Sequence, residues 1–122
     1  MNLRYFDFDF SEDAQGHGSF EAMASALATR LPELETELLR VLAWAHGEAP
    51  GERGPLEEGG QWDYLLNAVQ EVTTPLELRY EPGSQALGWQ AGLPGAARVT
   101  LTLTITGTPA FCTAFRQNFG LD

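Results

Sequence analysis

The residues that could hold a metal ion lie near the start of the chain. They are carboxylates and one imidazole, which are common ligands of divalent cations, and the set is Asp7, Asp9, Asp13 and His17. Asp7 and Asp9 stand two apart on an expected strand, so their side chains project from one face about 6.6 Å apart. A small metal-assisted hydrolase is therefore one hypothesis. The spacing matches no loop that wraps an ion, so a solvated outer strand face is the preferred interpretation.

The remaining candidates for catalysis have simpler structural explanations. His17 lies between two glycines, which favours an exposed turn over a rigidly held base. His46 falls in the last turn of an expected helix, where its ring can meet free carbonyls. Cys112 falls in the first turn of another helix, but it belongs to an apolar stripe and is expected in the core. No serine lies in a nucleophile elbow, and no glycine spacing predicts a phosphate cradle. We therefore expect no catalytic residue and no cofactor.

The net charge of the chain indicates which classes of partner it can bind. The 122 residues include 17 acidic and 7 basic side chains, which gives a net charge of −10. Every basic residue is an arginine, so Schiff-base lysine chemistry is excluded. An acidic surface repels phosphate, so neither nucleic acids nor anionic membranes are expected as partners. Solubility is the preferred explanation of the acidic surface, and a basic protein partner is the alternative.

Cysteine usage and hydropathy bear on the compartment. Cys112 is the single cysteine, which leaves no internal disulfide and no thiolate zinc site. The first ten residues lack the apolar core of a signal peptide, and no run approaches 18 apolar residues. We expect a cytoplasmic protein whose single domain spans residues 1–122, with its oligomeric state left open.

Alternation of apolar and polar residues predicts strands at both ends of the chain. In residues 3–10, one face of the expected strand is aromatic and consists of Phe6, Phe8 and Phe10. In residues 98–106, Val, Leu and Ile alternate with threonine without error. The threonine face is expected to meet water.

The middle of the chain also favours strands. Residues 76–81 alternate, and Leu76, Leu78 and Tyr80 are expected to face the core. A type II turn at Pro82-Gly83 leads into a second strand through Leu87 and Trp89. Residues 62–72 fit either a strand or a helix, and strand is preferred because of their aromatic content.

Helical spacing runs through residues 19–46, with a break expected near Leu31 because Pro32 fits a first helical turn. Residues 32–46 are predicted as a helix with Glu37 and Arg40 paired on its outer side. For residues 19–29, alanine content favours a helix, and a strand that pairs back on residues 3–10 is the alternative. A second helix follows a Thr108 cap and ends at Gly120.

A glycine-rich and acidic segment at about 47–61 is predicted as a flexible loop. Together with Asp7 and Asp9, the glutamates of this loop could form one negative binding surface. These glutamates are Glu48, Glu52, Glu57 and Glu58. Trp62 and Trp89 lie beside glycine-rich turns, where aromatic side chains can line a ligand pocket or a protein contact. A place in the core is the preferred interpretation for both.

The order of these elements predicts an α+β fold of two layers. A mostly antiparallel sheet of four to five strands is expected to carry the helices on one face. The preferred functional hypothesis is a non-catalytic domain that binds another protein, in the manner of an inhibitor or adaptor. A metal-assisted hydrolase and a small-molecule-binding sheet remain as alternatives.

Overall fold

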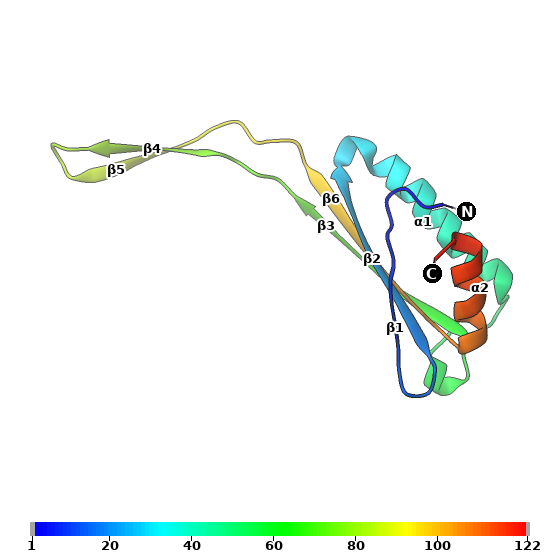
Figure 1. The fold of residues 1–122 in the computed structure, drawn as a ribbon. Helices are drawn as coiled ribbons and strands as arrows, with labels where there is room; N and C mark the ends of the chain where they lie inside the picture. The colour runs from blue at the N-terminus through cyan, green and yellow to red at the C-terminus, as the bar shows by residue number, and fades with distance from the viewer. Residues whose placement is uncertain (1, 122) are drawn as a thin grey trace.

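The computed structural model describes residues 2–121, and these residues form an α+β fold. Four strands make an antiparallel sheet in the order β1-β2-β6-β3, and they are β1 (Asp9–Glu12), β2 (Gly18–Leu27), β6 (Arg98–Gly107) and β3 (Trp62–Glu71). Helices α1 (Leu31–Glu48) and α2 (Pro109–Phe119) cover one face of this sheet (Figure 1). The predicted α+β class, with helices packed on a mostly antiparallel sheet, is confirmed.

Strand β6 is the centre of the sheet, because β2 and β3 pair with its two edges over ten residues each. Its aliphatic side chains are buried beneath the helices, and its threonines lie on the opposite face. The alternation in residues 98–106 predicted this strand correctly, with Gly107 as one further residue. The preferred strand at 62–72 is also confirmed as β3.

The helix favoured at residues 19–29 is wrong, and the alternative strand is confirmed as β2. Its side chains alternate between buried and exposed, and Ala22, Ala24 and Ala26 point toward the helix layer. Small side chains there let α1 approach the sheet closely, so the alanines serve packing and not helix formation. A period of two therefore overrode intrinsic helix propensity.

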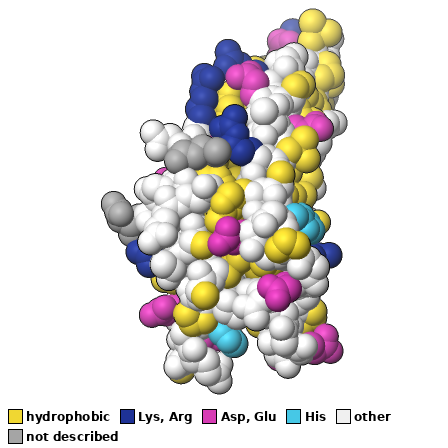
Figure 2. Space-filling view, turned by 90° about the vertical axis from the view of Figure 1, so that its right-hand side faces the viewer, with side chains coloured by type: hydrophobic (Ala, Val, Ile, Leu, Met, Phe, Trp, Pro, Cys, Tyr) yellow, Lys and Arg dark blue, Asp and Glu magenta, His cyan; other side chains and the backbone are white. Residues whose placement is uncertain are grey.

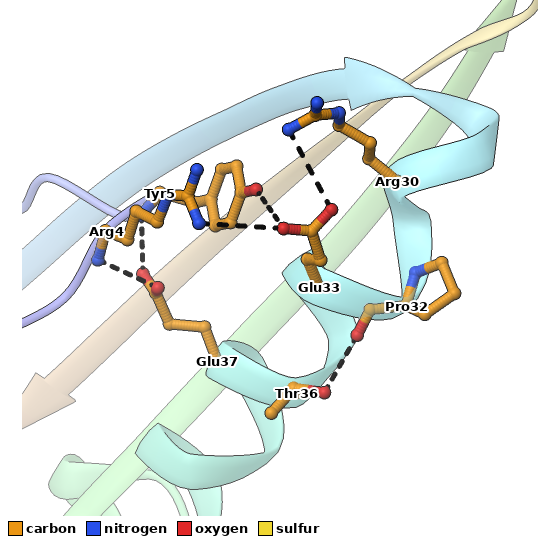
Figure 3. Close-up of polar contacts among 7 residues, drawn as sticks. All are labelled: Arg4, Tyr5, Arg30, Pro32, Glu33, Thr36 and Glu37. Carbon is orange, nitrogen blue, oxygen red and sulfur yellow. Dashed lines mark hydrogen bonds and ion pairs between the residues drawn. The ribbon is translucent and has the colours of Figure 1, made fainter.

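The N-terminal strand is shorter and later than predicted, since β1 begins at Asp9 and continues to Glu12. Phe6 and Phe8 are nevertheless buried in the core, as the alternation indicated, but the same expectation is wrong for Phe10, which is 37% exposed. The strand begins late because the backbone of residues 4–6 bonds to a helix side chain instead of a neighbouring strand. Figure 3 shows these bonds for Arg4 and Tyr5.

That side chain is Glu37 of α1, which is only 6% exposed. Its carboxylate accepts three backbone N–H groups, from Arg4 at 2.8 Å, Tyr5 at 2.9 Å and Phe6 at 2.8 Å. Nearby, the Tyr5 hydroxyl donates to Glu33 at 2.9 Å (Figure 3). The predicted outward pairing of Glu37 with Arg40 is therefore wrong, because Glu37 holds the N-terminal segment against the helix.

Helix α1 extends to Glu48, so Gly47 is helical and the segment predicted as a loop at 47–61 begins at Ala49. Within it, a single 3-10 turn spans Leu56–Glu58. Gly54 N–H donates to the Trp62 carbonyl, and Gln61 N–H donates to the Glu52 carbonyl. These bonds attach the segment to the start of β3.

Strands β4 (Leu76–Glu81) and β5 (Ala86–Ala91) form a separate two-stranded hairpin. With its two connecting segments it makes up residues 72–97, named here the β-arm, which projects well beyond the helices (Figure 1). The predicted strands are confirmed. The prediction of a type II turn at Pro82-Gly83 is wrong, because the residue with a positive φ in this turn is Gln85 and not Gly83. The inward orientation of Leu76, Leu78 and Tyr80 is also wrong, because all three are more than half exposed.

Helix α2 packs on the sheet at two glycines that face each other across β2 and β6, Gly18 and Gly107. A Cβ atom at Gly107 would lie only 3.0 Å from Cγ of Phe111. One at Gly18 would lie 2.5 Å from Sγ of Cys112. The absence of side chains at both positions allows the buried stripe of α2 to contact the sheet backbone.

We expect Glu37→Ala to lower the free energy of unfolding by about 3 kcal/mol, because it leaves three backbone N–H groups without an acceptor. Glu37→Gln keeps an acceptor oxygen and should cost about 1 kcal/mol. Urea denaturation measures both values. Glu35→Ala is the control, since Glu35 is exposed on the same helix. A loss for Glu37→Ala no larger than that of the control would contradict the role of Glu37.

We expect Gly107→Ala to destabilise the fold by about 2 kcal/mol, because the added methyl group overpacks the contact with Phe111. The matched control is Gly47→Ala, a helical position with no atom within 4 Å of the added Cβ. That substitution should stabilise the protein by about 0.5–1 kcal/mol through helix propensity. Thermal unfolding of the two variants should therefore shift in opposite directions.

Candidate functional site

An open depression of about 370 Å³ lies where β1, β2 and the loop before β3 meet. Three carboxylates and one imidazole line it together with hydroxyl groups, and the lining set is Ser11, Glu12, Asp13, His17, Gly18, Ser19, Leu56, Glu57 and Thr106. The turn between β1 and β2 positions Asp13 and His17, and the 3-10 turn supplies Glu57. The depression is acidic and open to solvent, so it does not enclose a small molecule as a deep pocket does.

Asp13 and His17 are the two predicted metal ligands that the structure brings together. His17 Nδ1 lies 3.6 Å from Asp13 Oδ2, and Asp13 Oδ1 accepts the backbone N–H groups of Gln15 and His17. Asp7 and Asp9 are exposed, and neither lines the depression. Within residues 2–121, no three His, Cys, Asp or Glu side chains come close enough to hold a metal ion. The Asp13 carboxylate thus stabilises a turn.

The other predicted binding residues are dispersed. Trp62 is fully buried, stacked on Phe111 at 5.6 Å and in edge contact with His46 at 4.9 Å, so it belongs to the core. Trp89 lies on the β-arm and is 64% exposed. Glu57 faces the acidic depression, whereas Glu58 is exposed on the same 3-10 turn. The two tryptophans therefore do not share a pocket.

Cys112 is buried in the core, as its place in the apolar stripe predicted. Burial raises the pKa of its thiol, and the charge of Glu12 acts in the same direction. The backbone of Gly18 and the charge of Arg116 oppose the rise without cancelling it. The thiol donates a weak hydrogen bond to the Gly107 carbonyl at 3.4 Å. A neutral, buried thiol is poorly suited to act as a nucleophile.

We expect Cys112 to react at least about tenfold more slowly with iodoacetamide in the folded protein than in urea. Because its folded pKa is raised, the stability from burying the neutral thiol is present below the ordinary thiol pKa of about 8.5 and declines as pH rises toward the folded value. Cys112→Ala should remove this alkaline decline. Equal alkylation rates in the folded protein and in urea would contradict the burial of the Cys112 thiol.

The face of the four-stranded sheet opposite the helices, named here the open face, has no cover among the described residues. The threonines of β6 form its centre, and Met23 of β2 and Leu65 and Val69 of β3 flank them. These three side chains are 66%, 63% and 55% exposed. The predicted threonine face is thus confirmed, but large apolar side chains border it on both sides.

Acidic residues mark the β1 edge of the open face. Asp9 lies directly opposite Glu21 in the pairing of β1 with β2. Like charges in such a cross-strand pair destabilise a sheet. The ion pairs found among residues 2–121 include neither of these carboxylates. This edge therefore carries a repulsion that a cationic group would relieve.

The β-arm carries a second uncovered apolar surface. Its cross-strand pairs place the large side chains on one face, named here the apolar arm face, which consists of Leu76, Leu78, Tyr80, Leu87 and Trp89. Charged residues alternate with them on the other face of β4. Figure 2 views the molecule from the side opposite the β-arm, and hydrophobic side chains are also gathered along the upper right of that view. Sequence reasoning missed both apolar surfaces, because alternation has the same period whether or not a face is covered.

Comparison of the chain with protein-family models, curated proteins and solved structures finds no match. No helix formed by residues 2–121 is long and apolar enough to cross a membrane. The function has to be argued from the surfaces just described.

Proposed function

We propose that this chain is a non-catalytic, cytoplasmic domain that binds another protein, and that its partner presents a basic surface to the open face. The observation that carries the proposal is the exposure of Met23, Leu65 and Val69 beside the threonine row. Large apolar side chains that stay exposed on a sheet face mark a surface that a protein partner can cover. The lone free Cys112 is compatible with a reducing compartment.

Charge supports the basic character of the partner. Asp9 and Glu21 lie at one edge of the open face, and Asp63 and Glu71 lie along β3 at the other. Among the described residues, Arg98 of β6 lies on this face in the pairing with β3. Arg53 forms an ion pair with Asp63, with 2.9 Å between Nε and Oδ1. Opposite charge across an interface steers encounter and sets partner choice.

The unpaired carboxylates favour the β1 edge as the main point of contact. A cationic side chain placed between Asp9 and Glu21 would relieve their repulsion, so binding gains energy that the free domain lacks. The acidic depression at Glu12, Asp13 and Glu57 extends the same negative surface around the turn.

We expect the immobilised chain to retain basic proteins from an extract of its own cells at low ionic strength, and to release them as salt is raised. A double variant, Asp9→Asn with Glu21→Gln, should weaken retention about tenfold and raise stability by about 0.2–1 kcal/mol. Quantitative binding of the retained protein and thermal unfolding measure the two effects.

The control double variant, Glu77→Gln with Glu81→Gln, removes the same two charges from the β-arm. Its retention should match that of the unmodified chain. If both double variants lose retention equally, net charge alone is responsible and the proposed contact is wrong. If retention is indifferent to salt, the basic partner is excluded.

A further inference from the structure

The apolar arm face carries a second inference, which stands on different residues from the proposed function. Its pairs are Leu78 with Trp89 and Tyr80 with Leu87, followed by Leu76 with Ala91. The five large side chains are between 53% and 64% exposed. They form one contiguous surface on a ribbon of two strands.

This ribbon has little to stabilise it within one copy of the chain. A lone two-stranded hairpin is marginal in water, and it needs a packed apolar face to persist. Backbone bonds connect the segments at its base, from Gly92 N–H to Pro75 and from Gly95 N–H to Thr73. Neither helix reaches the apolar arm face (Figure 1). A partner that covers this face would supply the missing packing.

The charge distribution indicates which partner fits. Residues 72–97 contain two glutamates and one arginine, so the β-arm has a net charge of −1 and the remainder of the chain has −9. A basic protein is drawn to the body and gains little at the β-arm. A second copy of this acidic chain meets the least repulsion if the two copies touch through their β-arms.

The area is also appropriate for a pair of copies. The five exposed side chains offer on the order of 500 Å², a large part of the roughly 800 Å² per partner of a standard interface. A two-fold axis brings the same surface of both copies together, so one self-complementary face is sufficient.

We propose that this chain forms a homodimer in which the apolar arm faces of two copies pack against each other, as two layers of a small sandwich. The contact covers Trp89 and Tyr80, aromatic residues of the kind that dominate interface energies. It leaves the open face and the acidic edge of each copy free for another protein.

Sedimentation equilibrium of the purified full chain tests this proposal, and the expected mass is twice 13.3 kDa. Trp89→Glu should raise the dimer dissociation constant about 30-fold or more, because it places a charge in the contact. Gly88→Glu is the matched control. It adds the same charge at the neighbouring position of β5, on the opposite face and across from Arg79, and should remain dimeric.

Far-UV circular dichroism should show a folded body in both variants, and Leu78→Glu serves as a second disruption if Trp89→Glu fails to fold. A monomer at high micromolar concentration would overturn the proposal, and so would a dimer that Trp89→Glu leaves intact. If the chain is monomeric and floats with neutral phosphatidylcholine vesicles through Trp89, the face binds lipid and the dimer is wrong. None of these outcomes depends on capture of a basic partner, so the two proposals fail separately.

Discussion

The structure depends on one constraint, which is that two helices have to cover the apolar side of a much longer set of strands. Helix α1 has 18 residues and α2 has 11, so they are about 27 Å and 16 Å long. Strand β6 alone extends about 33 Å, and the β-arm continues beyond it. The helices therefore bury β2 and β6 and leave most of β3 and all of the β-arm uncovered. The exposed surfaces follow from this shortage of cover.

Where cover exists, it is achieved by very close contact. Alanines on β2, together with the glycines at the start of β2 and the end of β6, reduce side-chain bulk beneath the helices, as the contact of Phe111 with Gly107 illustrates. The N-terminal segment then closes the core from the side with Phe6 and Phe8. Because that segment has no strand neighbour for its backbone, Glu37 provides the acceptors instead. A buried carboxylate is tolerated here because its oxygens are engaged by N–H donors.

The sequence predicted the fold class and most element positions, because alternation and caps are local signals. The Thr108 cap and the left-handed Gly120 lie where the residue types predicted them. The helix at 19–29 failed because Phe20, Met23 and Leu27 imitate helical spacing while the buried residues of β2 repeat every second position. The predicted outward position of Glu37 was wrong for another reason, because its hydrogen-bond donors lie some thirty residues away in the sequence. Exposure of Leu78 and Trp89 was also out of reach, because a pattern records which face is apolar and not what lies above it.

Charge and hydrophobicity are separated along this chain, and the separation gives each uncovered surface a distinct character. The β-arm is apolar and nearly neutral, so its affinity for any partner is set by packing and depends little on salt. The open face combines exposed apolar side chains with opposed carboxylates at Asp9 and Glu21, so the contact proposed there is expected to depend on the charge of the partner. One acidic molecule can thus carry two contacts of different chemistry. Because they involve different residues, occupation of the β-arm does not remove the acidic edge from solvent.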